Sequence, residues 1–171
     1  MERLWAPWRM EYIETGIKAD GCFLCDRPAE DRDGENYILW RGRRTFVIMN
    51  IFPYNNGHIM VVPYAHKASI ASLDAETQAE LMAVTGMAVE AIREAMNPQG
   101  FNVGINLGKV AGAGVADHLH VHVVPRWGGD TNFMPVLGDV RVMPQHLRST
   151  YEQLLPAFKR LLPSDRSVGS D

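Results

Sequence analysis

Cysteine is scarce in this chain, with only Cys22 and Cys25 among 171 residues, spaced as C-x-x-C. In a reducing cytosol such a pair is more often a metal clip or a redox motif than a structural disulfide. The sequence therefore favours metal binding or thiol chemistry near residue 22 over a disulfide-stabilised fold.

Excess charge and long apolar runs are also missing. A formal net charge of -3 gives no basic footprint for nucleic acid, and we expect the short cluster Arg41, Arg43 and Arg44 to be a solvated hairpin turn around Gly42. No apolar run approaches the ~20 residues that span a bilayer, and the opening residues MERLWAPWRM lack the apolar centre of a signal peptide. We therefore expect a cytoplasmic protein whose partners are neither nucleic acids nor membranes.

The length and the 46% apolar content suit one domain with a sizeable core. Within it we distinguish an N-terminal arm with the C-x-x-C pair, residues 1–35, from a main domain with a C-terminal helix, residues 36–163. The stretch CDRPAEDRDGEN, residues 25–36, is rich in turn formers and charges and predicts an exposed loop. Residues 164–171 predict a disordered tail.

Hydrophobic patterning predicts strands around one long helix, for which Asp74 is the N-cap. A last amphipathic segment is expected to be helical despite Pro156. The expected elements are a hairpin over 37–50, a strand over 58–63, the helix over 74–96, strands over 101–108 and 118–127, and a helix over 144–162. We therefore predict an α+β fold, an antiparallel sheet of about five strands with one long helix and a C-terminal helix.

The stretch HLHVHVVPRW, residues 118–127, places histidine at every second position of an otherwise buried strand. Successive strand side chains point to opposite faces, so the three histidines share one face and the apolar residues between them take the other. The histidine face holds His118, His120 and His122, and the apolar face holds Leu119, Val121 and Val123. The apolar face would anchor the strand and leave three imidazoles for chemistry.

Three uses of this triad remain open from the residues alone. Three imidazoles are a common catalytic zinc set, although same-face residues of a regular strand lie about 7 Å apart and spread the ligands along a line. The histidines could instead be satisfied on a half-buried face without a chemical role. The third use is nucleophilic catalysis, because a neutral imidazole, with a pKa of about 6.5, can form a covalent phosphoramidate.

A glycine-rich loop, GKVAGAG over residues 108–114, precedes the triad and favours the third use. Glycine lets the main chain approach an anion closely, and we expect several unobstructed backbone N–H groups there. The amides near Gly112 and Gly114 would then bind phosphate oxygens.

HLHVHVV resembles the His-φ-His-φ-His-φ-φ signature of the histidine triad (HIT) family, in which φ is an apolar residue. NIFPYNNGHIMVVPYAH is similar to the family's Asn...Gly-His block, and CFLC to the C-x-x-C of zinc-containing members. The segments LWAPWRMEYI, GFNVGINLG and VVPRWGGDTNF more narrowly resemble bacterial members that phosphorolyse diadenosine tetraphosphate. The resemblance implies a HIT-like fold, a sheet shared across a homodimer, and nucleotidyl transfer or hydrolysis at an α-phosphate.

The resemblance also implies roles for individual histidines. His120 would be the nucleophile that forms a nucleotidyl-histidine intermediate. His122 would bind the α-phosphate and assist the leaving group, and His58 would face the same phosphates. The implied activity is cleavage of a dinucleoside polyphosphate, with diadenosine tetraphosphate as the first candidate.

Other residues would contact the nucleotide. Asn50 occupies the position of an Asp or Asn that contacts ribose hydroxyls. The base pocket would be formed by residues that, taken singly, are ordinary core residues: Phe23, Leu24, Ile48 and Ile51. The remaining candidates for nucleotide binding are Asn106, Gly112, Gly114 and Asn132.

Zinc-bearing relatives imply a second site, formed by Cys22, Cys25, His66 and His118. Two thiolates and two imidazoles make a closed tetrahedral set, which suits a structural ion and leaves no open position for water. His118 would then orient the strand without taking part in the chemistry. The alternative is a reduced dithiol with His66 on the surface.

The second reaction step and three other functions stay open. Some phosphorylase-type relatives carry Ser four residues before the first triad histidine, where this chain has Gly114. The acceptor is therefore either inorganic phosphate, which yields a nucleoside diphosphate, or water, which yields a monophosphate. The same nucleophile would serve a hydrolase of nucleoside phosphoramidates or adenylylated adducts. The chain could otherwise be a nucleotide-binding regulator with incidental turnover, or a zinc hydrolase with the triad as ligands.

Overall fold

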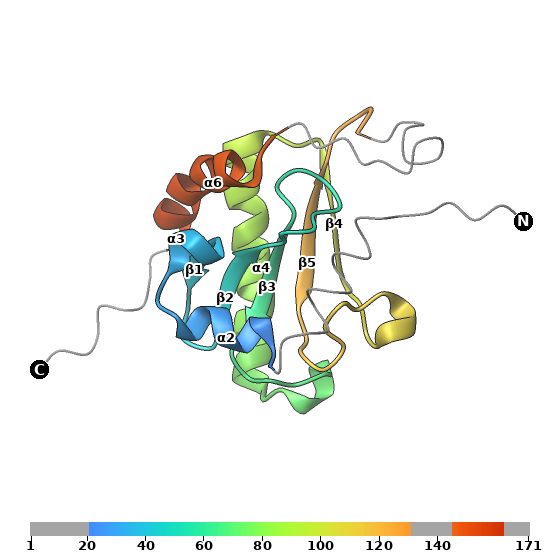
Figure 1. Cartoon of the computed structure of the whole chain (residues 1–171). Helices are drawn as coiled ribbons and strands as arrows, with labels where there is room; N and C mark the ends of the chain where they lie inside the picture. The colour runs from blue at the N-terminus through green and yellow to red at the C-terminus, as the bar shows by residue number, and fades with distance from the viewer. Residues whose placement is uncertain (1–20, 131–144, 163–171) are drawn as a thin grey trace, which may run out of the picture.

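The computed structural model describes residues 21–130 and 145–162, which contain a five-stranded antiparallel sheet in the order β1-β2-β3-β5-β4 (Figure 1). The strands are β1 (Ile38–Arg41), β2 (Thr45–Met49), β3 (Ile59–Pro63), β4 (Gly100–Ile105) and β5 (Val121–Arg126). The helices are α2 (Phe23–Ala29), α3 (Asp33–Asn36), α4 (Ala75–Met96) and α6 (Leu147–Leu161), with 3₁₀ turns η1 (Ile70–Ser72) and η2 (Lys109–Ala111). The predicted α+β class is confirmed.

Alternate side chains of the sheet enter two hydrophobic clusters. The larger cluster lies on the side of α4 and α6 and includes Val47, Val61 and Val123. The smaller cluster lies on the other face of the sheet, where Leu24 of α2 packs with the strand residues Phe46, Ile48, Met60 and Val62. Because both faces of β2 and β3 are covered, these strands are buried along their whole length.

The two main helices agree with the sequence prediction. Asp74 caps α4, since its carboxylate accepts the backbone N–H of Thr77 at 2.8 Å and the Thr77 hydroxyl at 2.9 Å. Helix α6 continues through Pro156, as expected. Leu154 and Phe158, both fully buried, anchor this helix in the core and offset the hydrogen bond that the proline removes.

Residues 25–36 do not form the expected exposed loop. They form most of α2 and all of α3, and α2 begins where the carbonyl of Cys22 accepts the N–H groups of Cys25 and Asp26. The predicted solvated turn is also wrong for Arg41, which is 7% exposed. Arg41 forms a bidentate ion pair with Asp33, so the charges that suggested a loop instead hold α3 against β1.

Strand β5 begins at Val121, later than predicted, so His118 and His120 precede it. Pro63, at the end of β3, has no N–H to donate to this segment, and its carbonyl accepts the Nε2–H of the His118 side chain at 2.8 Å. The N–H of Leu119 donates to the carbonyl of Lys67 at 2.7 Å. The predicted alternation survives, because the apolar residues of the segment belong to the cluster on the α4 side: Leu119, Val121 and Val123.

None of the helices within 21–130 and 145–162 has the length and apolar character needed to cross a bilayer. The predictions for residues 1–20, for Asn132 and for the tail fall outside the described residues.

Candidate active site and metal centre

His58 ends the loop between β2 and β3 and lies against His122 of β5, with 2.9 Å between His58 Nε2 and His122 Nδ1. Both side chains are buried. The preceding residue, Gly57, has a φ of 75°, and a Cβ there would lie 2.6 Å from Met96 Sδ. Glycine is therefore required at this position, which explains the Gly-His order in physical terms.

The donors around His58 determine where the protons lie on this histidine pair. The N–H of Tyr54 donates to His58 Nδ1 at 3.0 Å, and Asn50 Nδ2 approaches the same nitrogen at 3.4 Å. His58 therefore carries its proton on Nε2 and donates it to His122 Nδ1. His122 carries its own proton on Nε2, which is buried and has no hydrogen-bond partner among the described residues. A buried donor without an acceptor is suited to an anion.

His120 has the opposite arrangement of ring nitrogens. Its Nδ1 donates to the carbonyl of His118 at 2.8 Å, so its Nε2 carries the lone pair. The ring lies 4.8 Å from that of His122 between centroids, at an interplanar angle of 76°. A nitrogen nucleophile thus lies beside a hydrogen-bond donor, an arrangement able to attack and stabilise a phosphoryl group.

Burial keeps these imidazoles neutral near pH 7. It lowers the pKa of His120, against the opposite effect of the hydrogen bond to the His118 carbonyl. It lowers the pKa of His122 to about 4, and the neighbouring His120 acts in the same direction. The neutral form is the one in which an imidazole lone pair is available for attack.

The four predicted zinc ligands Cys22, Cys25, His66 and His118 meet at the start of the histidine segment. Their ligand atoms all lie within 4.8 Å of one another. His118 Nδ1 lies 3.3 Å from the Sγ of Cys22 and 3.4 Å from that of Cys25, and Cys25 Sγ lies 3.3 Å from His66 Nδ1. A tetrahedral zinc ion with its usual bond lengths has sulfur–nitrogen edges of about 3.6 Å, so this donor set fits zinc.

The protonation of this cluster also suits a metal ion. His118 donates Nε2–H to the carbonyl of Pro63 at 2.8 Å, which leaves the Nδ1 lone pair facing the sulfurs. Burial raises the pKa of Cys25 to about 11, with Cys22 adding to the effect. The Cys25 thiol by itself favours the protonated form, so metal binding there would release a proton.

The triad does not converge on one point. His118 belongs with the cysteines, the Nδ1 of His120 is bound to backbone, and the Nδ1 of His122 is bound to His58. Among the described residues the three histidines form no metal-ligand group of their own. This arrangement gives no support to a zinc hydrolase that uses the triad as ligands.

The glycine-rich loop departs from the expectation of unobstructed amides. The N–H groups of Ala111 and Ala113 donate to the carbonyl of Gly108, and that of Gly112 donates to the carbonyl of Lys109 at 3.0 Å. These bonds close the 3₁₀ turn η2, so Gly112 is not a free donor. Within the described residues no hydrogen bond occupies the N–H of Gly114, which is exposed.

The residues predicted to contact base and ribose fall into two groups. Leu24 and Ile48 are fully buried in the smaller cluster and Phe23 packs against it, whereas Ile51 is half-buried outside it. Asn50 lies against the histidine pair, and its Oδ1 accepts the N–H of Phe52 at 2.9 Å. Asn106 lies next to Gly112, with its Nδ2 3.7 Å from where a Cβ on that glycine would be.

Sequence reasoning missed Tyr54 and Asp130. The Tyr54 ring packs on the histidine pair, 4.6 Å from His58 and 5.5 Å from His122 between centroids. An aromatic residue just before the Gly-His block was an available signal for it. Asp130 binds Arg126 and Asn55, and nothing in the sequence pointed to it because Asn55 comes from a distant loop.

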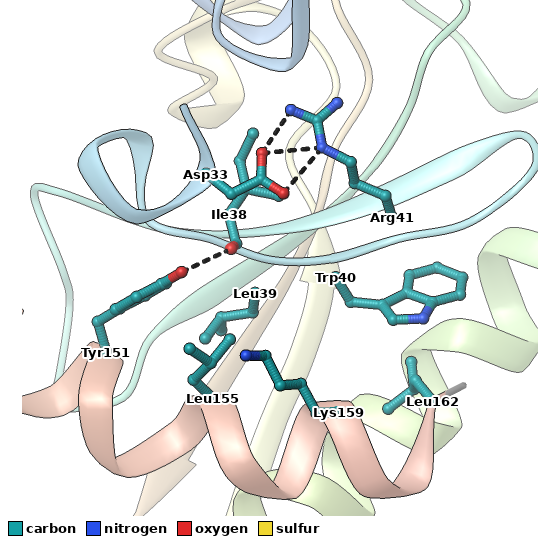
Figure 2. Close-up of a pocket in the computed structure, with 9 residues that line it drawn as sticks. All are labelled: Asp33, Ile38, Leu39, Trp40, Arg41, Tyr151, Leu155, Lys159 and Leu162. Carbon is teal, nitrogen blue, oxygen red and sulfur yellow. Dashed lines mark hydrogen bonds and ion pairs between the residues drawn. The ribbon is translucent and has the colours of Figure 1, made fainter. Parts of the chain in front are cut away.

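A hollow of about 340 Å³ lies at the other edge of the sheet, between β1, α3 and α6 (Figure 2). Figure 2 shows the Arg41–Asp33 pair on its wall, above Lys159 and Leu155 of α6. None of the predicted site residues lines this hollow.

Comparison with known proteins identifies the family. Residues 34–129 match the HIT domain, and the chain belongs to the HIT family. The AP-4-A phosphorylase of Mycobacterium tuberculosis is 43% identical over 168 residues, which cover 94% of this chain and 86% of that protein. The adenosine 5'-monophosphoramidase hnt1 of Schizosaccharomyces pombe is 24% identical over 115 residues, 67% of this chain and 83% of that protein.

Solved structures agree with this placement. A zinc-bound histidine triad family protein from Mycobacterium smegmatis superposes with a TM-score of 0.66 and 26% identity, over 85% of this chain and 96% of that chain. The predicted HIT membership and the HIT-like fold are thus confirmed.

Proposed function

We propose that this HIT-family enzyme cleaves dinucleoside polyphosphates, diadenosine tetraphosphate first among them, through a nucleotidyl group carried on His120. The observation that carries the proposal is the pair of opposite ring nitrogens, the lone pair of His120 Nε2 beside the buried N–H of His122 Nε2. The first is a nucleophile and the second a donor to phosphate oxygens. Similarity to an AP-4-A phosphorylase over 94% of the chain supports the substrate class.

The first step forms a bond between His120 Nε2 and the α-phosphorus and breaks the bond from phosphorus to the leaving oxygen. The electron pair of the broken bond departs with the leaving group, which is ATP when the substrate is diadenosine tetraphosphate. His120 keeps its proton on Nδ1, and the His118 carbonyl, which accepts a hydrogen bond from this N–H, stabilises the charge that the ring acquires. His122 Nε2–H donates to a phosphate oxygen as negative charge develops there.

The second step returns the lone pair to His120. An acceptor oxygen attacks the phosphorus, and the phosphorus–nitrogen bond breaks. We propose inorganic phosphate as the acceptor, which releases ADP, and the name of the mycobacterial relative supports this choice over water. The N–H of Gly114 is the donor that the glycine-rich loop offers to the acceptor or to the α-phosphate.

The nucleoside contacts complete the proposed site. Asn50, already beside His58, would hold the ribose hydroxyls. The base would lie against Phe23 and Ile51, because the other two predicted pocket residues, Leu24 and Ile48, are fully buried in the smaller cluster. Asn106 and Asn132 remain candidates for contacts to phosphate or sugar.

The cysteine–histidine cluster is proposed to hold a structural zinc ion. Such an ion would crosslink α2, the segment after β3 and the start of the histidine segment, and four protein ligands leave it no open position. The zinc-bound mycobacterial structure supports this assignment. His118 then acts in the chemistry only through its backbone carbonyl.

A homodimer in the cytoplasm is proposed as the working form, with nucleotides rather than nucleic acids as partners. The sheet ends at β4, whose Val103 is 48% exposed, and Met82 and Met87 of α4 are also exposed. Two copies paired along β4 would cover this edge. Val103→Asp would place a charge on this exposed edge, and we expect the dimer to weaken in analytical ultracentrifugation.

Hydrolysis of nucleoside phosphoramidates is the second candidate function. It uses the same His120 nucleophile with a smaller leaving group, and the similarity to a monophosphoramidase of Schizosaccharomyces pombe favours it. Adenosine 5'-phosphoramidate therefore belongs in the substrate panel.

The deciding experiment incubates the purified protein with diadenosine tetraphosphate, with and without inorganic phosphate, and separates the products by chromatography. We expect ADP and ATP only when phosphate is present. AMP and ATP without phosphate would make the enzyme a hydrolase. No cleavage of either compound in the panel, together with tight nucleotide binding, would favour a regulator.

A further inference from the structure

The carboxylate of Asp130, just beyond β5, lies at the centre of a partly buried hydrogen-bond network. Its side chain is 8% exposed and forms a bidentate pair with Arg126, at 2.6 Å to Nε and 2.8 Å to Nη2. The N–H of Trp127 donates to it at 3.1 Å. The hydrogen bond from Arg126 lowers the pKa of Asp130 to about 2, so the carboxylate is charged near pH 7.

The fourth donor to Asp130 comes from the loop that carries His58. Asn55 Nδ2 donates to the carboxylate at 2.8 Å and to the carbonyl of Pro125 at 3.1 Å. The backbone carbonyl of Asn55 in turn accepts the N–H of His58 at 3.2 Å. Asn55 thus links the end of β5 to His58, which donates a hydrogen bond to His122.

These contacts connect His122 of β5, by way of the loop before β3, to Asp130 just after β5. His122 binds His58, His58 binds the backbone of Asn55, and Asn55 binds Asp130, eight residues beyond His122. Tyr54 belongs to this loop and contacts both histidines. Its N–H donates to His58 Nδ1, which keeps the His58 proton on Nε2, and its ring packs on the imidazoles of His58 and His122. A shift of the loop would move that N–H, and His58 would no longer be restricted to the tautomer that donates to His122.

We infer that Asp130 is a positioning residue, which acts through Asn55 to hold the 50–58 loop where Tyr54 fixes the tautomers of His58 and His122. Its contribution is to keep the proton of His122 on the buried Nε2, where the proposed mechanism needs a donor to phosphate. The kinetic part of this inference rests on the proposed function, whereas the tautomer part does not.

The chain contains a control of the same chemistry at the other edge of the sheet. Arg41 and Asp33 also form a partly buried bidentate pair, shown in Figure 2, with an Nε–Oδ1 distance of 2.9 Å. That pair joins α3 to β1, and none of its hydrogen bonds within the described residues goes to a histidine. Asp33→Asn therefore removes a comparable ion pair without touching the contacts that connect His122 to Asp130.

The experiment compares full-length wild type, Asp130→Asn, Asn55→Ala and Asp33→Asn by long-range proton–nitrogen NMR of ¹⁵N-histidine-labelled protein. In wild type we expect His58 and His122 to be protonated on Nε2 alone. In Asp130→Asn and Asn55→Ala we expect mixed tautomers at both histidines, and in Asp33→Asn the wild-type pattern. Asn55→Ala leaves the Arg126–Asp130 pair in place. It therefore tests whether the loop contact controls the tautomers even if Asp130→Asn fails to fold.

Turnover of diadenosine tetraphosphate supplies the second readout. We expect kcat to fall roughly 10- to 100-fold in Asp130→Asn and Asn55→Ala with KM little changed, and to stay near wild type in Asp33→Asn. Wild-type tautomers in Asn55→Ala, or equal losses of kcat in Asp33→Asn and Asp130→Asn, would overturn the inference in favour of a purely structural role. If the wild type cleaves nothing, the proposed function fails, while the tautomer comparison still decides the role of Asp130.

Discussion

His118 and His122 lie four residues apart, and the structure gives their rings opposite hydrogen-bond partners. The carbonyl of Pro63 accepts Nε2–H of His118, which leaves the Nδ1 lone pair facing two thiols. His58 donates to Nδ1 of His122, which leaves a buried Nε2–H without an acceptor among the described residues. One ring is therefore prepared for a cation and the other for an anion. The use of each histidine follows from the partner of its second ring nitrogen.

The largest effect is expected from His120→Ala, which removes the proposed nucleophile between His118 and His122. Cleavage should fall by roughly a thousandfold or more, while the metal cluster stays intact. Product formation and bound zinc per chain are the measurements. His146→Ala, which removes an exposed imidazole at the start of α6, is the control. Normal turnover in His120→Ala would exclude the proposed mechanism.

Cys25→Ser tests the proposed metal site at His118 without changing His120 or His122. We expect loss of bound zinc and a decrease in the free energy of unfolding of about 4 kcal/mol or more, because a metal crosslink is lost. The folded fraction should retain far more cleavage than His120→Ala. Zinc analysis and urea unfolding measure the first two effects. Immediate loss of cleavage on chelation, with the fold intact, would instead place the metal in the chemistry.

The pH dependence of the free energy of unfolding tests the environment of His122. The pKa of His122 is lowered to about 4, whereas an unfolded imidazole titrates at about 6.5. Between these values the unfolded chain binds the extra proton. Stability is therefore full above about pH 6.5 and decreases toward pH 4, by up to about 1.4 kcal/mol per pH unit for this group. Urea unfolding at several pH values checks this, and His122→Asn should show a smaller slope than wild type.

The smallest effect is expected from Asn50→Ala, because Asn50 lies beside His58 and not next to the proposed nucleophile. Loss of one neutral hydrogen bond to ribose, about 1 kcal/mol, should raise KM about fivefold with kcat nearly unchanged. Steady-state kinetics with diadenosine tetraphosphate separates the two parameters. A loss of kcat with unchanged KM would mean that Asn50 acts through His58 and not on the ribose.

Local patterns predicted most of the fold. The helix at Ala75–Met96 was predicted because its apolar repeat and its Asp74 cap lie within one segment. The helices α2 and α3 were missed because their charged side chains are paired across elements, as Arg41 is with Asp33. The amides of the glycine-rich loop were expected to be free, but a local 3₁₀ turn uses that of Gly112.

The sequence predicted which histidines and cysteines lie in the candidate site better than it predicted the hydrogen bonds that hold them in place. The four cysteine and histidine ligands come together as the resemblance implied, and His58 lies against His122. Asp130 and Asn55 were not foreseen, because hydrogen bonds between a loop and a distant strand end leave no periodic trace in the chain.

The sequence by itself determined that His118, His120 and His122 alternate with buried apolar residues, because the two-residue period of extended chain is a local property. Only the tertiary structure decided which ring nitrogen of each histidine carries a lone pair. The partners that decide it for His118 and His122, the carbonyl of Pro63 and the ring of His58, come from β3 and from the loop before it. The packing of distant segments therefore separates three identical side chains into a metal ligand, a nucleophile and a hydrogen-bond donor in the proposed enzyme.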